Sequence, residues 1–448
     1  MSILPSYFKP APPQPQKSKE EVARLYPQLR LQILSATFIG YGTFYLVRNN
    51  LSAVAKEMQG ALAYDKSMIG DILAISAISY GLGKLLMGSL SDRSDARKFM
   101  AFGLLLTACC NFLFGAVENF PMHLTLWAIN GFVQGMGWAP SGRSIGHWFS
   151  IRERGSIFAI WNISHNIGGG VAGIIAAQSA LHWGWSSAFY VPGAIALVGS
   201  LFLFLTLKDT PQSVGLPPIE EYNDDYINPA IRENLHETEL TTRELFINNV
   251  LNNPKLWLFA FANFFVYIVR YSMLDWGPTY LREVKGASLE DGGIAILVLE
   301  FGGIPSTLLI GWFSDRVGGR RGMVSLLCMI PILLAFLGIL YNPAGKLSID
   351  MFCLAVIGFF VYPPVMLLGV AALDMTSKKA VGVAAGFVGL FGYIGRTVQA
   401  KGFGAISHYY TELGAVEQGW EVILYSIVGC TLLSIFLLAF TWNIRPRA

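Results

Sequence analysis

Two arginines, Arg48 and Arg270, lie inside apolar stretches of the sequence that are long enough to cross a bilayer. Their surroundings, "YLVRN" and "YIVRY", recur 222 positions apart in a chain of 448 residues. An ionised arginine at mid-bilayer costs about 2.5 to 3.5 kcal/mol, so each needs a partner or an aqueous cavity. Because a guanidinium binds phosphate in a bidentate manner, two matched arginines could together hold one phosphate dianion.

Hydrogen-bonding side chains share the helical faces of both arginines. Tyr41 and Tyr45 precede Arg48 by seven and three residues, and Tyr267 precedes Arg270 by three. Residues at this spacing lie on one face of a helix. We therefore predict that both arginines and these tyrosines face a common polar cavity.

Two further apolar stretches have polar stripes of the same kind. Tyr80 and Lys84 are four residues apart, and Asn162 and His165 are three apart. The apolar stretches together contain six cations and three clear acids, which leaves an excess of three positive charges. We infer that an anionic ligand, most simply a phosphate ester, balances part of this excess.

Structural explanations of the same residues stay open at this point. An arginine near the end of a span can extend to the membrane surface, and Asp275 or Glu300 could neutralise Arg270. Lys84 could form a structural ion pair, and His165 could be a core histidine. The tyrosines could serve only in packing. The match between the two halves of the chain favours a shared ligand.

The composition indicates a membrane protein. Hydrophobic residues make up 53% of the chain and charged residues 14%, and the mean hydropathy is +0.49. Such a chain has too few polar groups to cover a soluble globule of this size. We predict twelve transmembrane helices, at 31–55, 67–90, 99–117, 123–148, 155–182, 187–207, 256–278, 289–313, 323–341, 349–373, 381–408 and 420–442.

The cations predict the orientation of these spans. We assume that the N-terminus lies on the inner side of the membrane and that successive spans cross in opposite directions. Of the 32 Lys and Arg residues, 21 then fall in the tails and connections on the inner side, five in connections on the outer side and six within spans. The positive-inside rule then places both termini in the cytoplasm.

An internal repeat predicts the domain organisation. "GSLSDR" at 88–93 matches "GWFSDR" at 311–316, an offset of 223 residues. This predicts an all-α membrane protein built of two pseudo-twofold-related six-helix bundles. The predicted parts are a cytoplasmic tail (1–30), a first bundle (31–207), a cytoplasmic linker (208–255), a second bundle (256–443) and a short C-terminal tail (444–448).

The repeated loops predict gating contacts rather than catalysis. Asp92 with Arg93 and Asp315 with Arg316 occupy the same turn of each half, where we expect ion pairs that latch one conformation. Arg143 is predicted to be a gating or structural charge. The sequence contains no P-loop, H-E-x-x-H or G-x-S-x-G motif. We therefore predict a protein that is not an enzyme and that uses no cofactor, metal or nucleic acid.

The chain resembles the organophosphate:phosphate antiporters of the major facilitator superfamily. The resemblance rests on the paired G-x-x-x-D-R loops and on "YLVRNN", "QGMGWAPSGR", "RERGSIFAIWNISHNIGGG" and "YIVRYSMLDWGPTYLREVK". Within that group the motifs are most similar to those of bacterial glycerol-3-phosphate antiporters. The resemblance implies phosphate binding by Arg48 and Arg270, with cavity residues at Lys84, His165, Tyr41, Tyr45, Tyr80, Asn162, Tyr267, Tyr362 and Tyr393.

The function implied is import of glycerol-3-phosphate in exchange for inorganic phosphate, by a functional monomer with rocker-switch alternating access. Transport of a hexose phosphate or a phosphoglycerate, or membrane sensing of phosphate esters, are the alternatives. Asn49 replaces the lysine that often follows the first arginine in this family. Arg396 and Lys401 are unusual for the glycerol-phosphate pattern.

Overall fold

The computed structural model describes residues 6–91, 93–223, 251–375 and 381–444. Within these residues the regular structure is helical, as predicted, and twelve helices have 20 or more residues. They are α1 (Lys19–Leu46), α3 (Lys66–Ser91), α4 (Ala96–Ala116), α5 (Phe120–Trp148), α6 (Ile151–Trp183), α7 (Ser187–Thr206), α11 (Pro254–Val284), α12 (Leu289–Arg316), α13 (Arg321–Tyr341), α14 (Leu347–Asp374), α15 (Val381–Glu412) and α16 (Val416–Ala439).

Eight of the described helices are long and apolar enough to cross a membrane. The long helices outside that set are α1, α5, α6 and α15, and each of them contains at least one predicted site residue. The predicted count of twelve spans therefore stays a prediction. Most of the predicted linker, residues 224–250, lies outside the described residues.

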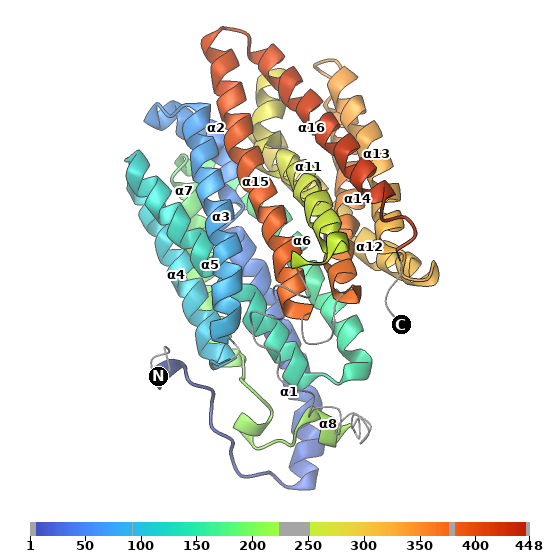
Figure 1. Ribbon diagram of the computed structural model, residues 1–448. Helices are drawn as coiled ribbons and strands as arrows, with labels where there is room; N and C mark the ends of the chain where they lie inside the picture. Colours follow the sequence, from blue (N-terminus) through green and yellow to red (C-terminus); the bar gives the residue numbers. More distant parts are fainter. Residues whose placement is uncertain (1–5, 92, 224–250, 376–380, 445–448) are drawn as a thin grey trace.

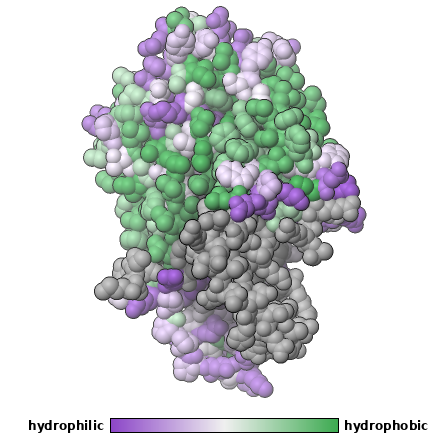
Figure 2. Space-filling model, viewed as in Figure 1, coloured by the Kyte–Doolittle hydropathy of each residue, from purple (hydrophilic) through white to green (hydrophobic). Residues whose placement is uncertain are grey.

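The surface agrees with a protein that spans a membrane. In Figure 2 hydrophobic residues cover much of the middle of the visible face, and hydrophilic residues gather toward both ends. Large apolar side chains such as Val198, Leu334 and Phe352 are exposed. Exposed apolar side chains in such numbers are stable against lipid but not against water.

The first predicted span is not one continuous helix. α1 ends at Leu46, and α2 (Asn50–Leu62) begins after a short turn that contains Arg48. The break leaves backbone carbonyls without helical donors, which is costly inside a membrane. Side-chain amides satisfy them: Asn111 and Asn130 each donate to the Val47 carbonyl at 3.1 Å, and Gln134 donates to the Phe44 carbonyl at 3.0 Å. These bonds fix the backbone that carries Arg48.

Small residues bring neighbouring helices into backbone contact. A Cβ atom at Gly83 would lie 2.2 Å from the Phe132 carbonyl oxygen, so only glycine lets α3 and α5 pack this closely. The two helices run side by side in Figure 1. Because α3 and α5 both line the cavity described below, this packing fixes the spacing of one of its walls.

Ion pairs join the two halves of the sequence at the end of the molecule farthest from the N-terminus, which we call the distal end. Figure 1 shows α2 at this end, and the N-terminus at the other. The pairs are Arg282 with Glu57 at 2.6 Å, Lys66 with Glu283 at 2.6 Å, and Lys401 with Asp71 at 2.7 Å. They hold α11 and α15 against α2 and α3, and so close the distal end.

Candidate functional site

The predicted site residues converge on a cavity of about 240 Å³ between the two halves of the sequence. Helices α1, α3, α6, α11, α14 and α15 each contribute predicted residues to its lining. Those that line it are Tyr41, Tyr45, Tyr80, Lys84, Asn162, His165, Tyr267, Arg270, Tyr362 and Tyr393. The remaining one, Arg48, lies against this lining, with its guanidinium 3.9 Å from the ring of Tyr80 and 5.1 Å from that of Tyr45.

The two arginines are buried, and no acid among the described residues forms an ion pair with either. Arg48 is 7% exposed and Arg270 is 6% exposed. In the described parts of the chain, neither has a carboxylate within ion-pair distance, and the Nη2 of Arg48 and the Nε of Arg270 have no hydrogen-bond acceptor. Arg270 lies 4.5 Å from the ring centroid of Tyr362 and 4.9 Å from that of Tyr271. Aromatic faces stabilise a cation only in part, so donors remain for an anion.

The acids that could have neutralised Arg270 contact other groups. Asp275 accepts two hydrogen bonds from Arg396, at 2.7 and 3.1 Å, and both side chains are buried. Glu300 accepts from the Asn166 amide at 3.1 Å, a contact between α12 and α6, and it also attracts Arg270, although no ion pair within 4.0 Å joins the two in the described residues. Arg396 is therefore a structural partner of Asp275, and Lys401, which is paired with Asp71, does not line the cavity.

His165 links the two halves of the cavity wall. Its Nδ1 forms a hydrogen bond with the carbonyl of Asn162, and because a carbonyl only accepts, Nδ1 is the donor. Its Nε2 is then the ring nitrogen available to a ligand. The ring centroid lies 5.5 Å from that of Tyr45 and 5.8 Å from that of Tyr362.

Six residues of the lining were not predicted from the sequence. Tyr271 directly follows Arg270, lies four residues after Tyr267 and could have been found from that helical spacing. The others carry no sequence signal, because an apolar residue or a single threonine in a membrane helix can face lipid, core or cavity. They are Trp138, Phe158, Thr307, Val365 and Met366.

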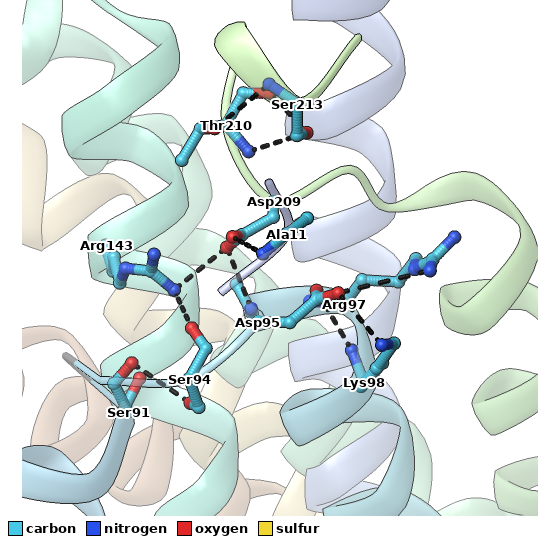
Figure 3. A network of polar contacts seen from close by, with 11 residues as sticks. Ala11, Ser91, Ser94, Asp95, Arg97, Lys98, Arg143, Asp209, Thr210 and Ser213 are labelled. Atoms are coloured by element: carbon cyan, nitrogen blue, oxygen red, sulfur yellow. Dashed lines mark hydrogen bonds and ion pairs between the residues drawn. The ribbon is translucent and has the colours of Figure 1, made fainter. Parts of the chain in front are cut away.

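Arg143 lies outside the cavity, in a polar network near the N-terminal segment (Figure 3). It pairs with Asp209 at 2.9 Å and donates to the carbonyl of Ser94. Asp209 also accepts from the backbone nitrogens of Ala96 and Ala11, at 3.0 and 3.1 Å. This single carboxylate thus joins α5, the start of α4 and the N-terminal segment.

The repeated loops have separate contacts. Asp315 pairs with Arg321 at 2.6 Å, and the Arg316 guanidinium lies 4.0 Å from the ring of Trp312. Arg93 is exposed, and Asp92 lies outside the described residues. The predicted gating role of these loops and of Arg143 stays a prediction.

Comparison with known sequences identifies close relatives. Residues 37–400 match the Major Facilitator Superfamily. The chain is 43% identical to the glycerol-3-phosphate transporter of Bacillus subtilis, over 98% of both chains. It is 38% identical to that of Haemophilus influenzae, over 96% of this chain and 94% of the relative. It is also 36% identical to the membrane sensor protein UhpC of Escherichia coli, over 88% and 90%.

A solved structure agrees in fold. The bacterial homologue of the human lysosomal transporter Spinster, in an inward-facing and unoccupied conformation, superposes with a TM-score of 0.72 over 94% of this chain and 99% of its own. The sequence identity is 14%, so this likeness concerns the fold alone.

Proposed function

The chain belongs to the major facilitator superfamily, and we propose that it is a secondary antiporter that imports glycerol-3-phosphate in exchange for inorganic phosphate. It is a multi-pass bacterial membrane transporter, not an enzyme. The names of its relatives support an organic phosphate as its substrate.

The unpaired arginines are the observation that carries the proposal. Arg48 comes from the first half of the chain and Arg270 from the second, and both are buried against one cavity. A phosphate dianion offsets both charges at once and accepts hydrogen bonds from both guanidinium groups. Tyrosine hydroxyls in the same wall can donate hydrogen bonds to the remaining phosphate oxygens.

The size of the cavity favours a small ester. Its volume of about 240 Å³ lies below the range of about 300 to 1,000 Å³ that is usual for drug-sized ligands. A three-carbon phosphate ester suits this space better than a hexose phosphate. The substrates in the names of the first two relatives agree with this choice.

We propose that the two bundles, 31–207 and 256–443, rock about this cavity as a functional monomer in the bacterial inner membrane, with both termini in the cytoplasm. Without a ligand, the two guanidinium groups repel each other and resist closure. A bound dianion attracts both and lowers the barrier to reorientation. Exchange follows because the empty carrier reorients slowly, and no ATP is needed.

The distal ion pairs provide a test of the rocking movement. Replacing Arg282 with Glu places a carboxylate opposite Glu57 and should slow phosphate exchange about tenfold, because distal closure loses roughly 1.4 kcal/mol or more. Adding Glu57→Arg should restore the rate to within about threefold of wild type, since the pair is re-formed with its charges reversed. A double variant as slow as the single variant would argue against a distal closure contact.

Transport by purified protein tests the proposed function directly. Liposomes loaded with inorganic phosphate should accumulate labelled glycerol-3-phosphate, and liposomes loaded with chloride salts should not. Uptake of glucose-6-phosphate and 3-phosphoglycerate is measured in parallel. Faster uptake of either ester would refute the proposed substrate. Binding of the ester without exchange would instead support a sensor, the candidate that the similarity to UhpC favours.

A further inference from the structure

Four apolar side chains line the cavity beside the polar ones, and phosphate binding does not use them. They are Trp138, Phe158, Val365 and Met366, which we call the apolar collar. All four are half-buried, whereas Arg270 is almost completely buried. The collar side chains are therefore more accessible than the arginine is.

Helix geometry gives the distance between the collar and the phosphate-binding residues. Met366 follows Tyr362 by four residues on α14, and the Arg270 guanidinium lies 4.5 Å from the ring of Tyr362. Phe158 precedes Asn162 by four residues on α6. One helical turn is about 5.4 Å, so an ester whose phosphate contacts Arg270 extends its carbon chain into the collar.

Among the described residues that line the cavity, two polar groups, Lys84 and Thr307, lie at the level of the collar. The Lys84 ammonium lies 4.6 Å from the ring of Trp138 and forms no ion pair within the described residues. Thr307 donates its hydroxyl proton to the Gly303 carbonyl at 2.9 Å, which leaves its oxygen free to accept. Beside the apolar side chains, the collar region thus has one donor, the Lys84 ammonium, and one acceptor, the Thr307 oxygen.

We propose that the apolar collar, with Lys84 and Thr307, sets the substrate specificity of the cavity for esters of about three carbons. This inference rests on the proposed function. Glycerol-3-phosphate has two free hydroxyls, which match Lys84 and Thr307. A hexose phosphate has four, so two of them would face Trp138, Phe158 or Met366 without a hydrogen-bond partner, and its ring would need the space that these side chains fill.

Truncation of the collar tests this specificity. Met366→Ala and Phe158→Ala are reconstituted in phosphate-loaded liposomes, and uptake of each ester is divided by the phosphate–phosphate exchange of the same variant. The ratio of glucose-6-phosphate to glycerol-3-phosphate uptake should rise about tenfold in each. Thr307→Val should raise the KM for glycerol-3-phosphate about fivefold, because the acceptor is lost while the shape is kept. The matched control is Phe352→Ala, an exposed residue of α14, which should leave the ratio at the wild-type value.

The outcomes separate the collar from the proposed function. If both truncations left the ratio of glucose-6-phosphate to glycerol-3-phosphate uptake within twofold of wild type, the collar would not set the specificity. The proposed transport of glycerol-3-phosphate would be unaffected by this result. If the wild-type protein took up 3-phosphoglycerate but not glycerol-3-phosphate, the proposed substrate would be wrong. The proposed role of the collar would still be supported, since both esters have three carbons.

Discussion

Replacing Arg48 or Arg270 with lysine is expected to lower phosphate exchange by about 10- to 100-fold in each case. Lysine keeps the positive charge but loses the planar fork, and a hydrogen bond to a charged group contributes roughly 1.5 to 3 kcal/mol. Arg270 lines the cavity and Arg48 lies against its lining, and neither has an acidic partner in the described chain, so we expect one bound anion to offset both charges. Phosphate–phosphate exchange in liposomes measures the loss.

A conservative exchange outside the cavity provides the control. Arg97 is partly exposed near the start of α4 and is not among the residues that line the cavity, so Arg97→Lys should leave exchange within about twofold of wild type. Near-normal exchange in Arg48→Lys or in Arg270→Lys, with the protein folded, would mean that only one arginine holds the phosphate. The shared binding site would then be wrong.

Breaking the pair between Asp275 and Arg396 is expected to destabilise the protein by about 3 to 5 kcal/mol. Asp275→Asn leaves the buried guanidinium of Arg396 without its carboxylate, and Arg396→Gln leaves the carboxylate of Asp275 without its cation. The double variant buries no unpaired charge and should be more stable than either single variant. Thermal unfolding in detergent, followed by loss of monomeric protein, measures the order of stability.

The exposed pair between Lys401 and Asp71 is the matched comparison. Its side chains are 66% and 31% exposed, so solvent screens the interaction, and Asp71→Asn should cost no more than about 1 kcal/mol. A cost for Asp71→Asn equal to that of Asp275→Asn would show that burial does not set the strength of these pairs. A double variant less stable than both single variants would contradict the role given to Arg396.

The site residues that could be predicted from the sequence are mainly those whose charge is costly to place in a membrane, and those that share a helical face with them. Arg48 and Arg270 are conspicuous because a buried cation needs a compensating group, and Tyr41 and Tyr45 follow from helical spacing. Tyr362 and Tyr393 were predicted as cavity residues only from the family resemblance. The all-α fold follows from composition, since a membrane chain satisfies its backbone by forming helices or closed barrels.

Contacts between distant segments could not be predicted from one sequence. The break after α1 depends on amides of Asn111 and Asn130, which belong to other helices. The partner of Arg396 is 121 residues away. The collar residues Phe158 and Met366 have the same apolar character as side chains that face lipid, and only packing assigns them to the cavity.

The most direct measurement of the central claim is an experimental structure of the protein with inorganic phosphate bound. We predict that the phosphate lies between Arg48 and Arg270, with oxygens within hydrogen-bond distance of both guanidinium groups. A phosphate held by one arginine alone, or bound outside this cavity, would contradict the account.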